Sequence, residues 1–431
     1  MKKLLLLMMA VLAVSVTACG PESPITGTVK VQLTVDGAPL QQADVTVVLA
    51  NADLTAESVT EADGSAEFIT TPGTYTATAF FRKSEGNEVF NYNGTASVTV
   101  VEGENPAVNL PMTASKSSQL IIKEVYNGGC MDNEGTKNFQ KDKYVIVYNN
   151  SDKEVDASNM CLAMAQITNT ISTNKYTITD GVIEYETAGW TPASYAIWWF
   201  QTGTQVKIAP YSQILIAIYD AIDHTPTYSN SVDLSKADYC TYDIESGFTG
   251  NTAPASTIPT SNYMKTKVFG MGTLWPAPIL TFAPFLIMPE SDIRAFVDVE
   301  TNFDNRATNK SGNFCKIPTS WVLDALDIWS AADESKFFSR FPSTVNTGYK
   351  VLVNKLGYTM YRNVDKAATE ALPENEGKLV YDYAGAVNKD DTDPSGIDAE
   401  ASIAAGAHII YKDTNNSAND FHMRKVASIK K

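Results

Sequence analysis

Residues 144–152 read YVIVYNNSD, and an earlier stretch, residues 120–126, reads LIIKEVY. β-Branched and aromatic side chains dominate both stretches, which is the composition that favours β-strands. A third run, QILIAIY at 213–219, follows the turn-like sequence APYS at 209–212. Helix signals are sparse, and the stretch 321–329 fits an amphipathic helix or a strand. We therefore predict an all-β chain.

The N-terminal part carries shorter strand patterns at regular spacing. Val29, Val31, Leu33 and Val35 alternate with polar residues, and Asp-Gly or Pro-Gly turn signals follow at intervals. This pattern predicts a small β-sandwich over residues 25–115.

The polar segment 109–118 separates the two β patterns, so we place a domain boundary there. The second domain is then expected over residues 119–431, as a sandwich enlarged by insertions at about 163–205 and 225–375. The fold prediction is thus two immunoglobulin-like β-sandwich domains.

Composition limits the function classes. The 431 residues carry 49 acidic and 33 basic side chains, a net charge of −16, without a basic run, which argues against nucleic acid as a partner. Only three histidines are present, which limits histidine-dependent acid–base and zinc chemistry.

The first residues predict a secreted, lipid-anchored protein. Two lysines precede a short apolar run, as in a signal peptide over residues 1–18. The sequence VTAC at 16–19 resembles the bacterial lipoprotein box, which implies cleavage before Cys19 and lipidation of its thiol. Residues 19–24 would form a flexible tether. The alternative is an ordinary secretory cleavage site followed by a free cysteine. The expected location is the outer membrane of a Gram-negative envelope, on its periplasmic or outer face.

Four further cysteines, Cys130, Cys161, Cys240 and Cys315, would lie in an oxidising compartment. They allow two disulfides, and we expect Cys130–Cys161 with Cys240–Cys315 because Cys130 and Cys161 adjoin neighbouring predicted strands. The alternative is four buried, reduced cysteines.

Two resemblances refine the fold prediction. Residues 35–77 carry, in order, G-x-P-L, A-x-V-x-V, D-G-x-A-x-F and P-G-T-Y, a series similar to the carboxypeptidase-regulatory, transthyretin-like family. This resemblance implies a spacer domain without catalytic residues.

Residues 119–431 contain I-x-K-E-V-Y, V-Y-N-N-S-D-K-E-V-D, I-A-P-Y-S-Q-I-L-I-A and D-T-N-N-S-A-N-D-F in this order, and they resemble the lamin-tail domain. The usual Leu-x-Gly-Trp after the second strand is missing, since residues 157–160 read ASNM. The region is more similar to uncharacterised envelope lipoproteins that carry this pattern, a domain of unknown function, which implies no established activity.

Signatures of catalysis are missing from the sequence, which has no GxSxG, HExxH or P-loop motif. Asp220, Asp223 and His224 follow a predicted strand and form either a ligand cluster or a hydrogen-bonded loop corner. Among Asp391, Asp393 and Asp398, the spacing D-x-D-x-S-G predicts a calcium loop, although Pro394 and Ser402 depart from the usual pattern. The alternative there is a solvated acidic loop. We expect no other cofactor.

Tryptophans form the remaining candidate site. Trp190, Trp198 and Trp199 fall within one insertion and Trp275 in another. Indole faces on loops are suited to stacking on sugars, planar ligands or a protein partner. In a strand they would instead belong to the core.

These observations favour a non-catalytic binding or accessory lipoprotein that captures a ligand for a TonB-dependent transporter or docks on it. An envelope carbohydrate-active hydrolase would need two acidic residues converging near Trp198 or Trp199. A structural surface or adhesion protein would present flat, pocketless insertions.

Overall fold

A computed structural model gives the fold and describes residues 26–85, 88–104, 106–165, 183–243, 245, 256–268, 282–304, 313–332 and 334–430. The predicted leader, Cys19, the tether and Trp275 lie outside the described residues. The chain divides into two compact units, one of residues 1–79 and 93–113, the other of residues 80–92 and 114–431. Residues 80–92, expected in the first domain, therefore group with the second unit. No helix in the described part is both long and apolar enough to cross a membrane.

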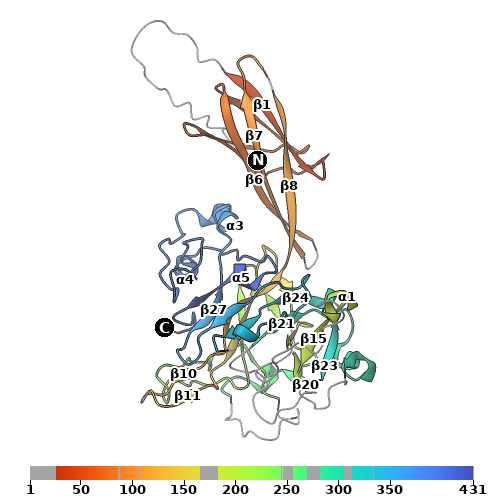
Figure 1. The fold of residues 1–431 in the computed structure, drawn as a ribbon, viewed down its shortest axis with the longest axis vertical. Helices are drawn as coiled ribbons and strands as arrows, with labels where there is room; N and C mark the ends of the chain where they lie inside the picture. The colour runs from red at the N-terminus through yellow and green to blue at the C-terminus, as the bar shows by residue number, and fades with distance from the viewer. Residues whose placement is uncertain are drawn as a thin grey trace, which may run out of the picture. The chain divides into compact units, whose positions relative to one another are not determined.

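The first unit is built from strands whose inward residues alternate with exposed ones. In β1 the side chains of Val29, Val31 and Leu33 are fully buried, as the alternation predicts. The strands follow the order β2-β1-β8-β7-β6-β3-β4, with β5 also paired to β1. Figure 1 labels β1, β6, β7 and β8 among them. Their bounds are β1 Gly27–Val35, β2 Ala38–Pro39, β3 Thr46–Ala50, β4 Thr55–Val59, β5 Ser65–Thr70, β6 Gly73–Glu85, β7 Glu88–Val100 and β8 Ala107–Ser118. Strands β6, β7 and β8 also include residues of the second unit.

The second unit contains two principal sheets. The first has the strand order β19-β18-β12-β9-β27-β28 and the second β20-β16-β14-β21-β24. The first sheet comprises β9 Leu120–Tyr126, β12 Tyr144–Asn149, β18 Gln213–Ala217, β19 Tyr239–Cys240, β27 Thr359–Arg362 and β28 Phe421–Arg424. The second comprises β14 Cys161–Met164, β16 Ala196–Trp199, β20 Lys265–Val268, β21 Pro284–Ile287 and β24 Val322–Ala325.

The central hydrophobic core lies between these sheets. It joins Ile122 and Val147 of the first sheet to Leu162, Trp198 and Leu286 of the second, which is the packing of a β-sandwich. The all-β, sandwich-type prediction is therefore confirmed.

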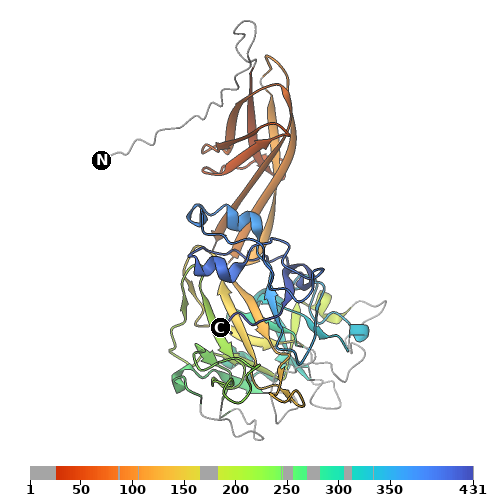
Figure 2. The same ribbon diagram turned by 90° about the vertical axis from the view of Figure 1, so that its left-hand side faces the viewer.

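Both faces of the first sheet are covered. Every residue of β9 and β12 is buried, because C-terminal residues such as Ile397 and Tyr411 pack against Ile121 and Tyr148 on the outer face. This double burial explains why LIIKEVY and YVIVYN read as continuous rather than alternating apolar runs. Figure 2 shows the C-terminal, blue part of the chain from a second side.

Short elements complete the second unit. The stretch 321–329, for which helix and strand were both open, forms two strands. The remaining strands are β10 Cys130–Met131, β11 Asn138–Phe139, β13 Val155–Asp156, β15 Trp190–Ser194, β17 Lys207–Ile208, β22 Phe303–Asp304, β23 Phe314–Pro318, β25 Ile328–Ser330 and β26 Lys350–Leu352. The α-helices are α1 Glu184–Ala188, α2 Ile293–Phe296, α3 Lys366–Glu370, α4 Ala399–Ala404 and α5 Ser417–Asp420. The 3₁₀ turns are η2 Thr260–Asn262, η3 Glu300–Asn302, η5 Thr319–Trp321, η6 Glu334–Lys336 and η7 Pro373–Asn375.

Candidate functional site

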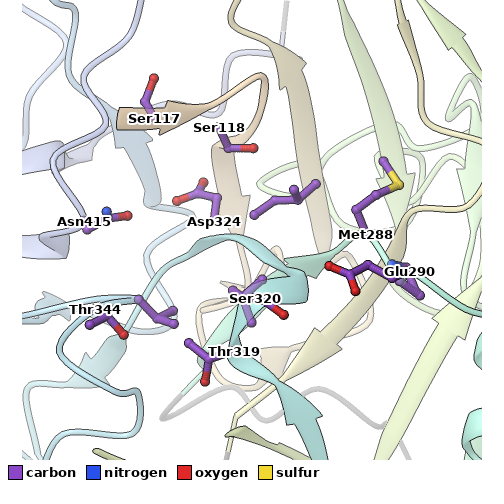
Figure 3. Close-up of a pocket in the computed structure, with 13 residues that line it drawn as sticks. Ser117, Ser118, Met288, Glu290, Thr319, Ser320, Asp324, Thr344 and Asn415 are labelled. Atoms are coloured by element: carbon purple, nitrogen blue, oxygen red, sulfur yellow. The ribbon is translucent and has the colours of Figure 1, made fainter. Parts of the chain in front are cut away.

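A pocket of about 570 Å³ opens in the second unit (Figure 3). The end of β8, the residues after β21, the η5 turn with β24, residues 344–345 and the loop before α5 all contribute to its wall. Its volume falls within the range of small-molecule sites, roughly 300–1,000 Å³. The lining residues are Ser117, Ser118, Met288, Pro289, Glu290, Thr319, Ser320, Val322, Leu323, Asp324, Thr344, Val345 and Asn415.

Hydroxyl groups dominate the polar part of this lining. Serine and threonine side chains come from three separate segments, and Met288 and Leu323 supply apolar surface beside them. The hydroxyl oxygens of Ser117 and Ser118 are buried and have no hydrogen-bond partner among the described residues. These oxygens have almost no exposed surface, so a ligand or a water molecule would reach them only after a small movement of the pocket wall. Such a contact would remove the cost of a buried polar group without a partner.

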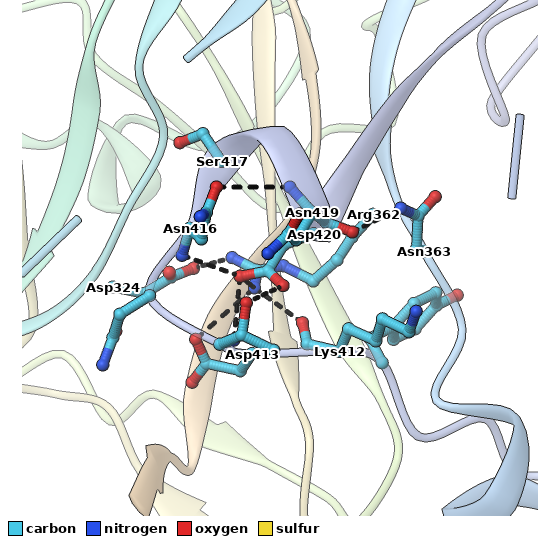
Figure 4. Close-up of polar contacts among 12 residues, drawn as sticks. Asp324, Arg362, Asn363, Lys412, Asp413, Asn416, Ser417, Asn419 and Asp420 are labelled. Carbon is cyan, nitrogen blue, oxygen red and sulfur yellow. Dashed lines mark hydrogen bonds and ion pairs between the residues drawn. The ribbon is translucent and has the colours of Figure 1, made fainter. Parts of the chain in front are cut away.

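Next to Asp324 of the pocket wall, a buried arginine ties several segments together (Figure 4). Arg362, at the end of β27, donates to the carbonyl oxygens of Ile122, at 2.6 Å, and Lys412, at 2.8 Å. It also donates to the carboxylate of Asp324, which lines the pocket. The ring of Phe421 lies 4.3 Å from its guanidinium carbon. One side chain therefore fixes strands from both sheets and the C-terminal loop.

Two more carboxylates face Arg362. Asp413 Oδ1 lies 3.6 Å and Asp420 Oδ2 3.9 Å from Arg362 Nη1, and all three side chains are almost fully buried. Burial, with Asp324 nearby, raises the pKa of Asp413 to about 7, and Arg362 opposes this shift. Asp413 also accepts a hydrogen bond from the backbone N–H of Ser118 at 3.0 Å, which connects this cluster to the pocket wall. We call Arg362, Asp324, Asp413 and Asp420 the Arg362 cluster.

The loop 413–420 holds its shape through its own side chains. Asn416 caps α5 by accepting hydrogen bonds from the N–H groups of Ala418 and Asn419. Asp420 accepts from the N–H of Thr414 at 2.9 Å and from its hydroxyl at 2.7 Å. The motif D-T-N-N-S-A-N-D-F thus supplies two partners of Arg362 and positions Asn415 in the pocket wall.

Both carboxylate oxygens of Asp324 accept hydrogen bonds from other groups of the chain. One carboxylate oxygen accepts from the N–H of Ala325 at 2.8 Å, and the other from the N–H of Ile122 at 2.6 Å and from Arg362. Glu290 is the other carboxylate in the lining, and it is exposed. A general acid–base pair needs two carboxyl groups that can reach the substrate. The lining offers one.

The tryptophans do not form a common platform. Trp198 is 2% exposed in the central core, so its prediction as a ligand platform is wrong. Trp199 packs against the second core cluster, and Trp190 packs between Tyr185 and Phe314. Their strand positions direct these indoles into packing, which was the alternative from the sequence. Trp275 lies outside the described residues.

The expected disulfides Cys130–Cys161 and Cys240–Cys315 are wrong, because all four thiols are free and buried. Cys161 and Cys315 lie in one hydrophobic cluster, Cys240 in another, and Cys130 beside Asp142. Each predicted pair therefore joins separate parts of the core. Burial raises the pKa of Cys240 to about 11 and that of Cys315 to about 12.

The predicted calcium ligands have other partners. Asp391 forms an ion pair with Lys350, Asp393 accepts from the N–H groups of Val364 and Ser395, and Asp398 caps α4. Among the described residues, no group of three His, Cys, Asp or Glu side chains is placed to hold a metal ion. The residues fold into a capped turn rather than a shared ligand set.

The Asp220–His224 region forms a loop corner. Asp220 Oδ1 lies 3.7 Å from His224 Nε2, and both side chains are buried. Asp223 instead accepts hydrogen bonds from the N–H and hydroxyl of Thr225. The three residues therefore do not converge on one point.

Sequence reasoning missed the pocket and the Arg362 cluster. Serine and threonine residues in segments far apart along the chain give no sequence pattern. A usable signal was present in TMYR at 359–362, where an arginine ends an otherwise apolar strand. A charge in such a position requires buried partners.

Comparisons with known proteins place the chain as follows. Residues 209–428 match the family described as a protein of unknown function, DUF4876. A solved DUF4876 family protein from Bacteroides thetaiotaomicron is similar, with 21% sequence identity, a TM-score of 0.54 and coverage of 93% of this chain and 95% of that chain. A DUF3823 family protein from Parabacteroides merdae has 13% identity and a TM-score of 0.18, over 45% of this chain and 96% of that chain. No curated protein matches.

Proposed function

This chain belongs to the DUF4876 family, and from that premise we propose that it is a non-catalytic, ligand-binding lipoprotein of the outer membrane. The observation that carries the proposal is the pocket whose wall includes the Ser117 and Ser118 hydroxyls, without a partner among the described residues, and Asp324 of the buried Arg362 cluster. A binding site works best when its shape is fixed before the ligand arrives. Buried connections from Arg362 to Ile122, Asp324 and Lys412 would provide this preorganisation.

The lining indicates the class of ligand. Hydroxyl groups both donate and accept hydrogen bonds, and so match a ligand that carries hydroxyl groups itself. The described lining contains two carboxylates and no Lys, Arg or His, which disfavours an anion. Met288, Val322 and Leu323 would contact the apolar faces of such a ligand. We therefore propose a neutral, hydroxyl-rich small molecule such as a short oligosaccharide.

Binding rather than hydrolysis is favoured by the state of the carboxylates. Asp324 accepts two backbone N–H groups and Arg362, so it is not available as a nucleophile or base. Glu290 alone would not perform the two-carboxylate reaction of glycosidases.

Blocking the pocket tests this function. Ser320 is exposed at the pocket, so Ser320→Trp would fill the space without disturbing the core. We expect the wild-type chain to bind members of an oligosaccharide panel and Ser320→Trp to lose that binding at least tenfold. Ser261→Trp, at an exposed serine of η2 that does not line the pocket, is the matched control. Undiminished binding by Ser320→Trp, or no binding by the wild type to any glycan, would contradict the proposal.

The membrane context is a second part of the proposal. Lipidation of Cys19 would anchor the protein, and the first unit would act as a transthyretin-like spacer for a lamin-tail-like second unit. Labelling with an alkyne fatty acid should mark the wild type and fail on Cys19→Ser.

At the outer membrane, the anchored protein would deliver its ligand to a TonB-dependent transporter or dock on it. Crosslinking in intact cells should recover such a receptor, and its absence from crosslinks of the lipidated protein would refute docking.

A further inference from the structure

A second hollow of the same unit has the opposite charge character. It encloses about 420 Å³ and shares no lining residue with the hydroxyl-rich pocket. Residues 130–131 of β10, residues 355–357 and the C-terminal segment 425–430 form most of its wall. The described lining residues are Cys130, Met131, Asn230, Lys355, Leu356, Gly357, Lys425, Val426 and Lys430. This described lining includes three lysines and no carboxylate side chain.

The hollow gathers three lysines in a chain of net charge −16. Some exposed lysines of the second unit form ion pairs, as Lys207 does with Asp156 and Lys267 with Asp298. Among the described residues, Lys355, Lys425 and Lys430 have no carboxylate oxygen within ion-pair distance. Lys430 Nζ donates only to the carbonyl oxygen of Ser229, at 3.3 Å.

The backbone fixes the positions from which the lysines project. The N–H of Lys355 donates to the carbonyl of Gly128 and that of Lys425 to the carbonyl of Gly385, at 3.0 and 2.9 Å. Gly357 has φ +71° and its N–H donates to Gly129, which holds residues 355–357 against β10. Two segments more than sixty residues apart thus contribute lysines to the wall of one hollow. Leu356 and Val426, 52% and 50% exposed, add apolar surface beside them.

We propose that this hollow binds a phosphate group, carried by a small organic molecule or by a lipid headgroup. Three unpaired ammonium groups attract a multiply charged anion, and lysine binds phosphate as a compact point charge. The volume exceeds that of a bare phosphate, and the apolar side chains would contact the organic part. This inference does not rest on the oligosaccharide proposal, because the residues are different.

The test compares two charge-matched variants of the full chain. The first carries Lys355→Gln, Lys425→Gln and Lys430→Gln. The control carries Lys207→Gln, Lys267→Gln and Lys366→Gln, three exposed lysines outside the hollow. The probes are glycerol 3-phosphate, measured by calorimetry, and phosphatidylcholine vesicles with or without phosphatidic acid, measured by flotation. Binding should fall with added salt, because exposed charges are screened.

We expect the wild type and the control to bind at least one probe, and the first variant to lose at least tenfold in affinity. Binding of glycerol 3-phosphate would identify a soluble ligand as the source, and binding to acidic vesicles alone would identify a headgroup. The proposal is overturned by failure of the wild type to bind either probe, or by equal losses in the two triple variants. Because Lys355 and Lys425 are exposed and the half-buried Lys430 makes only one long hydrogen bond, at 3.3 Å, their loss should leave the denaturation midpoint nearly unchanged.

Discussion

Replacing Arg362 by methionine should destabilise the second unit enough to unfold it. The substitution keeps the apolar stem and removes a buried cation that faces Asp324, Asp413 and Asp420. Removing one partner of a buried ion pair costs about 3–5 kcal/mol, because the remaining charge stays buried without compensation. The carbonyls of Ile122 and Lys412 also lose a donor, at about 1 kcal/mol each. The expected loss is therefore about 5–7 kcal/mol, comparable to the whole stability of many domains.

Urea denaturation followed by tryptophan fluorescence measures this loss. All six tryptophans lie at or after position 190, so the signal reports on the second unit alone. Arg362→Lys retains the charge without the planar fork, and a loss of about 2–3 kcal/mol is expected. The Arg362→Lys variant gives a measurable free energy of unfolding if Arg362→Met does not fold. Arg294→Met is the matched control, because the Arg294–Asp292 pair is about half exposed and should contribute at most about 1 kcal/mol.

The pH dependence gives an independent check. Without Arg362 the buried carboxyls would have folded-state pKa values raised above their unfolded values, so the folded state would bind more protons. The deficit relative to the wild type should then shrink as the pH falls from 8 to 5. A loss no larger than that of Arg294→Met, or a deficit that does not change with pH, would refute the role given to the Arg362 cluster.

Three further predictions concern the core. Burial, with Arg424 and Lys350 nearby, lowers the pKa of His422 to about 3. Below pH 6.5 the unfolded state therefore binds more protons than the folded state, and the free energy of unfolding falls as the solution becomes more acidic. From pH 8 to pH 5 the wild type should lose about 2 kcal/mol more of this free energy than His422→Gln, and parallel pH profiles would contradict the prediction. In the native Cys19→Ser chain, the four buried thiols should react slowly with a thiol reagent. After unfolding without reductant, all four thiols should react, and a count below four would indicate a disulfide. Trp198→Ala should cost about 3–5 kcal/mol and the more exposed Trp199→Ala clearly less, and equal losses would show that Trp198 is not a core residue.

The strands of both units could be predicted because their chemistry is local. Val29, Val31 and Leu33 alternate in the sequence and are buried in the structure, and the run 144–149 is apolar because both of its faces are covered. The pocket could not be predicted in this way. Its hydroxyls come from segments as far apart as Ser118 and Thr344, and their convergence depends on tertiary packing around Arg362.

The predicted disulfides and the prediction of Trp198 as a ligand platform were wrong for a related reason. Compartment and spacing suggested disulfides, but the fold places Cys240 and Cys315, one of the predicted pairs, in different hydrophobic clusters. An indole in a strand suits an exposed platform as well as a core, and Trp198 lies between the two sheets. Whether such an indole is exposed or buried depends on which face of its sheet the other sheet covers, and the sequence of one strand does not give that information.

The position of a bound ligand tests the central claim most directly. The measurement is a crystal structure of the full chain soaked with the tightest-binding oligosaccharide from the panel. We predict the sugar between Ser118, Ser320 and Thr344, with hydrogen bonds to the hydroxyls of Ser117 or Ser118 and with the Arg362 cluster unmoved. A sugar seated elsewhere on the chain, with this pocket filled only by water, would contradict the account.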